Sequence, residues 1–245
     1  MRPRFVDCHS HVLPSGDDGA KTIGDGLELC ELAARSGTEI LYATPHVWPH
    51  LVLTETRERA ILAAFEELRE QAPLELRLGY ELTPAPPLLH EDPARYVIEG
   101  TSVVLVEVPF AGPADELFAL TEHIEAAGLV PLIAHPERTE AVRSRPGIAE
   151  ELAARGWSLQ VNSTSLLGRH GPDAERIGWD LIERGHAQVV ASDGHRLTRP
   201  ARLDDAYELA VARVGEEAAA PLFDGTGLGL RARRRLPSRA GVPGA

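Results

Sequence analysis

Residues 5–22 read FVDCHSHVLPSGDDGAKT, and this stretch carries the first clue to the fold. A short apolar run ends in His9 and His11, and a loop rich in glycine and aspartate follows. Because alternate side chains of a strand point to the same side, the two imidazoles can reach one cation. Two surface histidines at a strand exit would explain the pair equally well, so its meaning depends on the rest of the chain.

Six further apolar, strand-like segments also end in a residue able to bind a metal, an anion or a proton. In a barrel of parallel strands the carboxyl ends converge on one face, and that face carries the chemistry of barrel enzymes. The repeated pattern therefore predicts a metal-dependent hydrolase with an α/β fold. The residues at these ends are His46, Glu81, Glu107, His135, Asn162, and Asp193 with His195.

Strands and helices are predicted to alternate along the chain. Thr22 suits the N-cap of a helix that closes at Gly37, and later helices also end at glycines, which favour C-terminal caps. The segment 81–96, with four prolines, is predicted to be irregular or briefly helical. Seven βα units result, with strands at 4–8, 40–43, 74–78, 103–106, 131–134, 158–161 and 188–191, and helices after 22 and at 54–71, 115–127, 139–155 and 173–184.

Length and composition predict a single domain over residues 1–230, since no linker divides the chain. The 245 residues are 43% hydrophobic, and no apolar run approaches the length of a membrane span. No apolar leader follows Met1, which predicts a cytoplasmic protein without direct membrane insertion. The basic, Pro/Gly-rich tail 231–245 is predicted to be disordered and to have no catalytic role.

Charge, cysteine and lysine content exclude several classes of protein. The net charge of -12 disfavours nucleic-acid binding, which needs clustered Lys and Arg. Cys8 and Cys30 make no disulfide framework, and we expect both to be reduced. Pro14 and Ser36 stand where a cysteine-based phosphatase loop needs arginine, so that mechanism is excluded. The only lysine, Lys21, precedes the first predicted helix, which excludes amidohydrolases that bridge two metals with a carboxylated lysine.

Glu107 shows most clearly that the predicted strand ends need cations. It closes the apolar run VVLVEVPF, where an uncompensated carboxylate would cost several kcal/mol. Asp17 and Asp18 add carboxylates beside the first pair of histidines. Imidazole and carboxylate ligands without thiolate favour Mn, Fe or Zn. Because the candidate ligands outnumber the needs of one ion, a cluster of two or three divalent metals is predicted, and such clusters suit phosphoryl transfer.

Three arginines lie close to these strand ends in the sequence. Arg138 stands three residues after His135, and Arg196 and Arg199 follow His195. A guanidinium fork matches the oxygens of a phosphate group. For each arginine the alternative is a solvated loop charge.

The motifs that carry this pattern resemble a known superfamily. DCHSHVLPSGDDGAKT, ATPH, GYEL, VEVPF, IAHPER, QVNSTSL and ASDGH, in this order up to about Ala201, resemble the polymerase and histidinol phosphatase (PHP) superfamily. The first and fifth motifs resemble more closely its CpsB/CapC branch, the manganese-dependent protein-tyrosine phosphatases of bacterial capsule and exopolysaccharide loci. The resemblance implies a distorted seven-stranded (β/α)7 TIM-like barrel with a trinuclear centre, most suitably of Mn.

Carried over position by position, the resemblance also implies ligands and catalytic residues. Arg138 and Arg199 would bind the phosphate group, and a metal-bridging hydroxide would attack phosphorus directly. His46 or a metal-bound water could supply a proton to the leaving group. One ion would be held by His9, His11, Glu81 and Asp193, the second by Glu81, Glu107 and His135, and the third by Asp18, His46 and His195.

The branch implies as substrate the phosphorylated tyrosine-rich tail of a bacterial tyrosine kinase that governs polysaccharide export. Histidinol-phosphate phosphatase, or another small-molecule phosphoesterase of the superfamily, would share almost every ligand. A metal-stabilised binding module without catalysis is a rival from another class, although no expected ligand is missing. The sequence leaves the oligomeric state open.

The loop after His46 departs from the pattern of many relatives. Those relatives have a second histidine where Val47 stands in this chain. His50 either substitutes for the missing histidine or lies at the surface. The departure affects substrate specificity more than chemistry.

Overall fold

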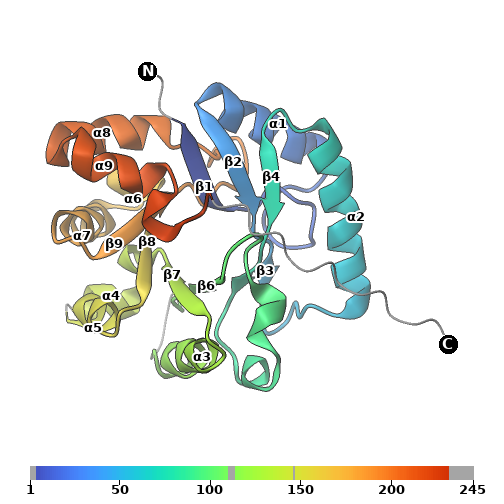
Figure 1. Ribbon diagram of the computed structural model, residues 1–245, viewed down its shortest axis with the longest axis horizontal. Helices are drawn as coiled ribbons and strands as arrows, with labels where there is room; N and C mark the ends of the chain where they lie inside the picture. The colour runs from blue at the N-terminus through green and yellow to red at the C-terminus, as the bar shows by residue number, and fades with distance from the viewer. Residues whose placement is uncertain (1–3, 110–113, 146, 232–245) are drawn as a thin grey trace.

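The computed structural model describes residues 4–109, 114–145 and 147–231, and its named strands pair in parallel (Figure 1). The strands are β1 (Phe5–Ser10), β2 (Thr38–Ala43), β3 (His46–Val47), β4 (Glu75–Leu78), β5 (Glu81–Leu82), β6 (Val103–Glu107), β7 (Val130–Ala134), β8 (Ser158–Asn162) and β9 (Ala187–Ala191). One sheet has the order β1-β2-β4 and the other the order β3-β5-β6-β7-β8-β9. The tail for which disorder is predicted lies, from residue 232 on, outside the described residues.

The strand pairing is interrupted between the two sheets. Pro45 has no N–H group and stands between β2 and β3, so the ladder lacks one hydrogen bond there, although the Pro45 carbonyl still accepts from the Glu81 N–H at 3.2 Å. Beside the break, the Gly79 N–H donates to the Ala43 carbonyl at 2.9 Å. On the far side, Ser10 forms a parallel bridge with Gly194. The predicted α/β fold with parallel strands is confirmed, whereas the hydrogen bonds form two sheets rather than one closed seven-stranded barrel.

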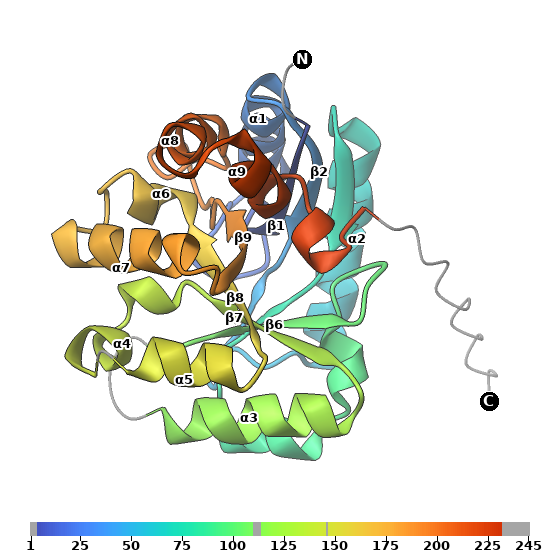
Figure 2. The same cartoon turned by 60° about the vertical axis from the view of Figure 1, so that its left-hand side comes forward.

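Helices cover the outer faces of the strands, as Figure 1 and Figure 2 show. The helices are α1 (Ile23–Arg35), α2 (Glu55–Gln71), α3 (Asp115–Ala126), α4 (Glu140–Ser144), α5 (Ile148–Ala154), α6 (Ser163–Leu166), α7 (Pro172–Glu183), α8 (Asp204–Val214) and α9 (Glu216–Phe223). Thr22 begins α1 with a capping box and Thr54 caps α2, at the positions that the sequence predicts. Among the described residues, no helix combines the length and apolarity needed to cross a membrane.

The structure corrects the prediction of one helix over 139–155. The chain there forms a 3-10 turn at Pro136–Arg138, then α4 and α5 as separate short helices. The sequence RSRPGI lies at the division, and a proline disfavours helical backbone at the residue before it. Helices α6, α8 and α9 are not among the predicted elements, whereas the segment 81–96 does contain brief helical turns, as predicted.

Two apolar clusters hold the strands in place. The inner cluster takes alternate residues of the strands, among them Cys8, Tyr42 and Leu105. The outer cluster lies between the strands and the helices that cover them. Because each strand buries both faces, its position along the sheet is fixed, and the polar residues at its carboxyl end are brought to one level.

The opposite end of the strands is closed by the last described residues. Leu230 is fully buried, and its carbonyl accepts a hydrogen bond from Arg77 Nη1 at 2.7 Å. The Tyr42 hydroxyl also donates to this carbonyl, at 3.3 Å. Arg231 donates to the carbonyl of Arg4, so the two ends of the described chain meet beside the amino ends of the strands.

Candidate metal centre

The carboxyl ends of the strands bring the predicted ligands together around Glu81. The side chain of Glu81 is fully buried. Its Oε2 atom lies 3.0 Å from His9 Nε2, 3.1 Å from His11 Nε2 and 3.1 Å from His46 Nδ1. Its Oε1 atom lies 3.0 Å from His135 Nε2. A carboxylate shared by four imidazoles can bridge cations that lie on either side of it.

Asp193 joins this cluster from the loop that follows β9. Its Oδ1 atom lies 3.5 Å from both His9 Nε2 and His11 Nε2. Its Oδ2 atom accepts a hydrogen bond from Arg138 Nη1 at 2.5 Å and another from Arg199. One carboxylate therefore contacts two candidate metal ligands and both arginines that are predicted to bind phosphate.

Glu107 is the carboxylate that most needs a compensating charge. Burial, together with repulsion from Glu81, raises the pKa of Glu107 to about 8. The Thr83 hydroxyl donates a hydrogen bond to its Oε1 atom. Oε2 of Glu81 is also buried, and although three imidazoles lie close to it, none forms a well-aligned hydrogen bond with it. Two buried carboxylates so close together repel each other unless a proton or a cation lies between them, which fits a metal site.

Asp18, His46 and His195 form the outer side of the cluster. Asp18 Oδ1 lies 3.2 Å from His195 Nε2 and 3.6 Å from His46 Nε2. The Asp18 side chain is 48% exposed, whereas the two imidazoles are buried, so the cluster opens to solvent here. Burial lowers the pKa of His46 to about 3, which keeps its imidazole in the neutral form that binds metals.

The donor set fits the divalent metals that the sequence predicts. Within the described part of the chain, four groups of three buried side chains have ligand atoms within 4.8 Å of one another. They contain only imidazole and carboxylate donors, which suit Mn, Fe or Zn. These groups overlap, because His9, His11, His46 and Glu81 each belong to two of them, so the predicted division into three sets stays a prediction. The groups are His11, His46 and His195; His9, Glu81 and His135; His9, His11 and Asp193; and His46, Glu81 and Glu107.

The backbone is strained at two of the candidate ligands. His135 and Asp193, with φ of 35° and 52°, are the only non-glycine residues with positive φ in the described ranges. Such backbone costs energy and persists only where the surroundings hold it, which is common at functional sites. At Gly194, a Cβ atom would lie 2.6 Å from the backbone nitrogen of Ala201, so the turn after Asp193 admits only glycine.

A pocket of about 230 Å³ opens over the cluster, and two arginines form part of its wall. Nε of Arg199 is buried without a hydrogen-bond partner, and an unpaired guanidinium donor fits an anion. Arg196 lies outside this pocket, where it is exposed and donates to the Asp18 carbonyl at 3.3 Å, as a solvated loop charge would. The lining residues are Asp18, His46, Trp48, Glu107, His135, Arg138, Asp193, His195 and Arg199.

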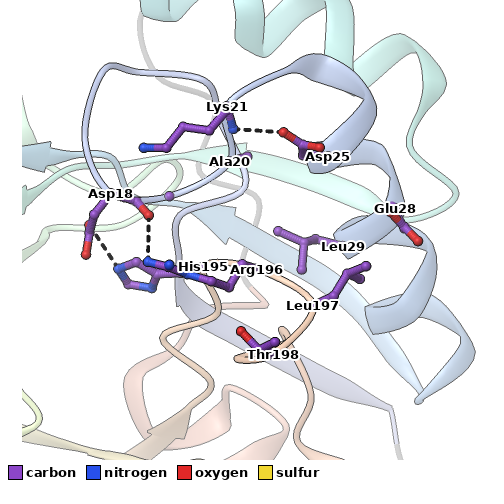
Figure 3. A pocket seen from close by; sticks show the side chains of 11 residues that line it. Asp18, Ala20, Lys21, Asp25, Glu28, Leu29, His195, Arg196, Leu197 and Thr198 are labelled. Carbon is purple, nitrogen blue, oxygen red and sulfur yellow. Dashed lines mark hydrogen bonds and ion pairs between the residues drawn. The ribbon is translucent and has the colours of Figure 1, made fainter.

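A second pocket, of about 370 Å³, adjoins the first on the side of α1 (Figure 3). Asp18 and His195 line both pockets. Away from these two residues, the second pocket is lined by the apolar Leu29 and Leu197, the latter 53% exposed, and also by charged residues such as Lys21, Asp25 and Arg196. The hollow surface therefore continues from the arginine-walled pocket onto an area of mixed apolar and charged side chains.

Sequence reasoning missed Gln160, although its neighbour Asn162 was identified at a strand end. His9 Nδ1 lies 2.9 Å from Gln160 Oε1. Gln160 Nε2 donates to Asn162 Oδ1 at 2.7 Å, and Asn162 Nδ2 donates to Asp193 Oδ2 at 2.8 Å. The available signal was the pair of amide side chains two residues apart in a buried strand, which places both on one face.

Arg57 was also missed, and it secures the loops that carry the outer ligands. It donates from α2 to the carbonyls of His46 at 2.8 Å, Leu51 at 2.9 Å and Ser15 at 3.2 Å. Asp17, a candidate carboxylate in the sequence, accepts a hydrogen bond from the His46 N–H at 3.0 Å. Asp17 therefore lies outside the cluster and holds the backbone of the candidate ligand His46. No signal in the sequence pointed to Arg57, because it is one of several charged residues in the predicted helix.

Trp48 and His50 extend the cluster outward as a stack of rings. The Trp48 ring lies 4.4 Å from the His46 ring, and the His50 ring lies 5.2 Å from that of Trp48. His50 is exposed and stands one ring away from His46. This position agrees with a surface residue rather than with a substitute ligand.

Comparison with known proteins gives a consistent family. The chain matches the family model described as capsular polysaccharide synthesis, CpsB/CapC, over residues 5–226. Tyrosine-protein phosphatase YwqE from Bacillus subtilis is 29% identical over 233 residues, which cover 93% of this chain and 92% of YwqE. Tyrosine-protein phosphatase CpsB from Streptococcus agalactiae serotype V is 27% identical, with coverage of 89% of this chain and 95% of CpsB.

A solved structure agrees with these matches. It belongs to a study of YwqE from Bacillus subtilis and CpsB from Streptococcus pneumoniae, described as unique metal-dependent tyrosine phosphatases. It superimposes with a TM-score of 0.79 at 28% identity and covers 89% of this chain and 90% of the other. Fold and sequence thus agree over nearly the whole described chain, which belongs to the CpsB/CapC family of capsular polysaccharide synthesis.

Proposed function

We propose that the protein is a metal-dependent tyrosine phosphatase that hydrolyses phosphotyrosine in a protein substrate. The observation that carries the proposal is the pocket in which a buried cluster of imidazoles and carboxylates faces Arg138 and Arg199. The relatives named tyrosine-protein phosphatase support the same activity. A doubly charged phosphate group needs both a cationic floor and guanidinium donors, and this pocket offers places for each.

The cluster would hold two or three divalent cations, most suitably Mn, with Fe or Zn as alternatives. Bound cations would supply a nucleophilic water and would neutralise charge on the phosphoryl oxygens. Glu81 would be the bridging ligand, since it contacts imidazoles through both oxygens. The remaining ligands in the proposal are His9, His11, Asp18, His46, Glu107, His135, Asp193 and His195.

The chain's own residues account for substrate binding. Arg138 and Arg199 would hold the phosphate oxygens, and their contacts with Asp193 keep both guanidinium groups in the wall of the pocket. Because the pKa of His46 is lowered, we assign His46 to cation binding rather than to proton donation. A phenolate leaving group, with a parent pKa of about 10, needs little protonation. Cys8 and Cys30 are buried and face no part of this pocket.

The family supports a role in capsule or exopolysaccharide regulation. The proposed substrate is the phosphorylated tyrosine-rich tail of a bacterial tyrosine kinase, and the proposed location is the cytoplasm. We also propose that the two sheets together form a distorted seven-stranded barrel, in which β2 with β3 and β4 with β5 each count as one interrupted strand because their register is the same. The bridge between Ser10 and Gly194 supports this, since it joins the first sheet to the end of the second.

The test compares a phosphotyrosine peptide with histidinol phosphate as substrates of the Mn-loaded protein. We expect the peptide to be preferred, chelation to abolish turnover, and His135→Ala to lower kcat/KM by roughly 100-fold or more, since the substitution removes a proposed metal ligand. His90→Ala, the same change at an exposed histidine, should leave kcat/KM unaltered. Preference for histidinol phosphate would contradict the proposal. Failure to hydrolyse either compound with metal bound would favour a binding module.

A further inference from the structure

Two amide side chains of β8 connect two candidate ligands of the same cation. Gln160 and Asn162 are fully buried. They form a continuous chain of hydrogen bonds from His9 Nδ1, through both amides, to Oδ2 of Asp193. None of these contacts involves the atoms that His9 and Asp193 direct at each other, which are Nε2 and Oδ1. The amides therefore contact the two ligands through the atoms that His9 and Asp193 do not direct at each other.

The direction of every hydrogen bond in this chain follows from its carboxylate end. A carboxylate oxygen can only accept, so Asn162 must turn its NH2 group toward Asp193 and its oxygen toward Gln160. For the same reason, Gln160 must turn its NH2 group toward Asn162. The oxygen of Gln160 then faces His9. Because this oxygen also only accepts, Nδ1 of His9 must carry the proton.

The protonation of Nδ1 decides what the other ring nitrogen can do. A neutral imidazole with a proton on Nδ1 has its lone pair on Nε2. Nε2 of His9 lies 3.0 Å from Glu81 Oε2 and 3.1 Å from His11 Nε2, at the centre of the cluster. The lone pair therefore points to where a cation would be bound.

We propose that Gln160 and Asn162 are positioning residues that fix His9 in its Nδ1–H tautomer and so set the affinity for the cation shared by His9 and Asp193. Arg138 and Arg199 complete the arrangement, since their contacts with Asp193 Oδ2 favour its ionised, accepting form. The inference rests on the proposed metal centre but is independent of the substrate. A structural explanation also exists, because a buried amide needs partners whatever its function. The test must separate the two.

The principal variant is Gln160→Met, which keeps the length of the side chain and removes its acceptor and donor. After removal of metal, Mn²⁺ is titrated back, and affinity and stoichiometry are measured. We expect Kd to rise roughly 10- to 100-fold, as for other residues that orient metal ligands. The matched control is Gln188→Met in β9, where Gln188 accepts a hydrogen bond from the Leu159 N–H at 2.6 Å. The control should bind Mn²⁺ like the unaltered protein. An unchanged Kd in Gln160→Met would overturn the proposal.

The tautomer itself is measured by nitrogen NMR of the histidine rings in the metal-free protein. We expect the proton of His9 on Nδ1 in the unaltered protein, and a mixture of tautomers in Gln160→Met. A proton on Nε2 with none on Nδ1 in the unaltered protein would contradict these hydrogen-bond directions. If Gln160→Met does not fold, Gln160→Glu serves instead, because its carboxylate still accepts from Nδ1 and should preserve the signal. Loss of the Nδ1–H signal in that variant would count against the proposal.

A second amide variant tests whether the two residues act as one chain. Asn162→Leu leaves the Gln160 amide free to turn over, so it should also weaken Mn²⁺ binding. Combined with Gln160→Met, it should add little, because the link is already broken. Fully additive losses in Mn²⁺ affinity would show that the two residues act independently, and would contradict the proposal that they act as one hydrogen-bonded chain. These outcomes do not depend on phosphatase activity. A failure of the proposed role of Gln160 and Asn162 can therefore be told apart from a failure of the proposed function.

Discussion

Glu137 is a buried carboxyl group just behind the candidate metal centre. Its Oε1 atom accepts hydrogen bonds from the Asn162 N–H at 3.0 Å and from the Ser165 hydroxyl at 2.7 Å, while Oε2 has no hydrogen-bond partner. Burial raises the pKa of Glu137 to about 7, more than these hydrogen bonds lower it. The folded protein therefore favours the protonated carboxyl group, while the unfolded chain does not.

The raised pKa of Glu137 predicts how this one residue makes the free energy of unfolding depend on pH. The pKa of Glu137 is higher in the folded protein than in the unfolded chain, so Glu137 stabilises the folded protein below about pH 4.5. This stabilisation, roughly 3 kcal/mol, is lost as the pH rises to about 7. Glu137→Gln cannot ionise, so the unaltered protein should lose stability relative to the variant between pH 5 and pH 8. Urea unfolding of both metal-free proteins at the two pH values measures the difference. Parallel pH dependences would contradict the prediction.

At the scale of elements, α2 is tied to the site through one side chain. Arg57 donates to carbonyls of two loops, one carrying Asp17 and Asp18 and the other carrying His46. Hydrogen bonds from a charged donor are worth about 1.5–3 kcal/mol. The helix therefore does more than cover the sheet, since it sets the spacing of the outer ligands.

Loss of this connection should affect catalysis more than folding. Arg57→Met should lower kcat/KM for a phosphotyrosine peptide by roughly tenfold or more, because the loops that carry the outer ligands would move apart. Arg59→Met makes the same change two residues away, on the exposed surface, and should have no effect. Kinetics and metal content of both variants supply the comparison. Equal activity of the two variants would show that the loops hold their positions without Arg57.

The elements also show what sequence can and cannot reveal. The strand ends at Glu107 and His135 are predictable, because a buried parallel strand is an apolar run and a polar residue marks its end. The role of Gln160 is not predictable, since it depends on contact with His9, which is 151 residues away in the chain.

At the scale of the whole molecule, the metal centre affects stability as well as activity. Ligands from strands throughout both sheets meet at Glu81, and the chain has a net charge of -12. Bound cations would offset repulsion among Glu81, Glu107 and Asp193 and would link the two sheets. Any ligand that binds only the folded state stabilises it, by about 2.7 kcal/mol at a concentration 100 times its Kd.

Removal of metal should therefore lower the melting temperature. For a chain of this size, the loss of binding energy predicts a fall in Tm of roughly 5–10 °C after chelation. Differential scanning calorimetry with and without Mn²⁺ measures the shift. Glu81→Gln should remove most of it, whereas Glu137→Gln should retain it, because Glu137 is not among the proposed ligands. A Tm that does not respond to metal would contradict the proposed centre.

The two described chain ends lie together at the amino ends of the strands, where Arg231 contacts Arg4. The candidate metal centre lies at the carboxyl ends, on the opposite face of the molecule. A fluorophore, a carrier domain or a solid support attached beside Arg4 or Arg231 would therefore lie on the face opposite the metal centre. The phosphate pocket would remain turned outward, accessible to a bulky phosphorylated protein as readily as to a free peptide.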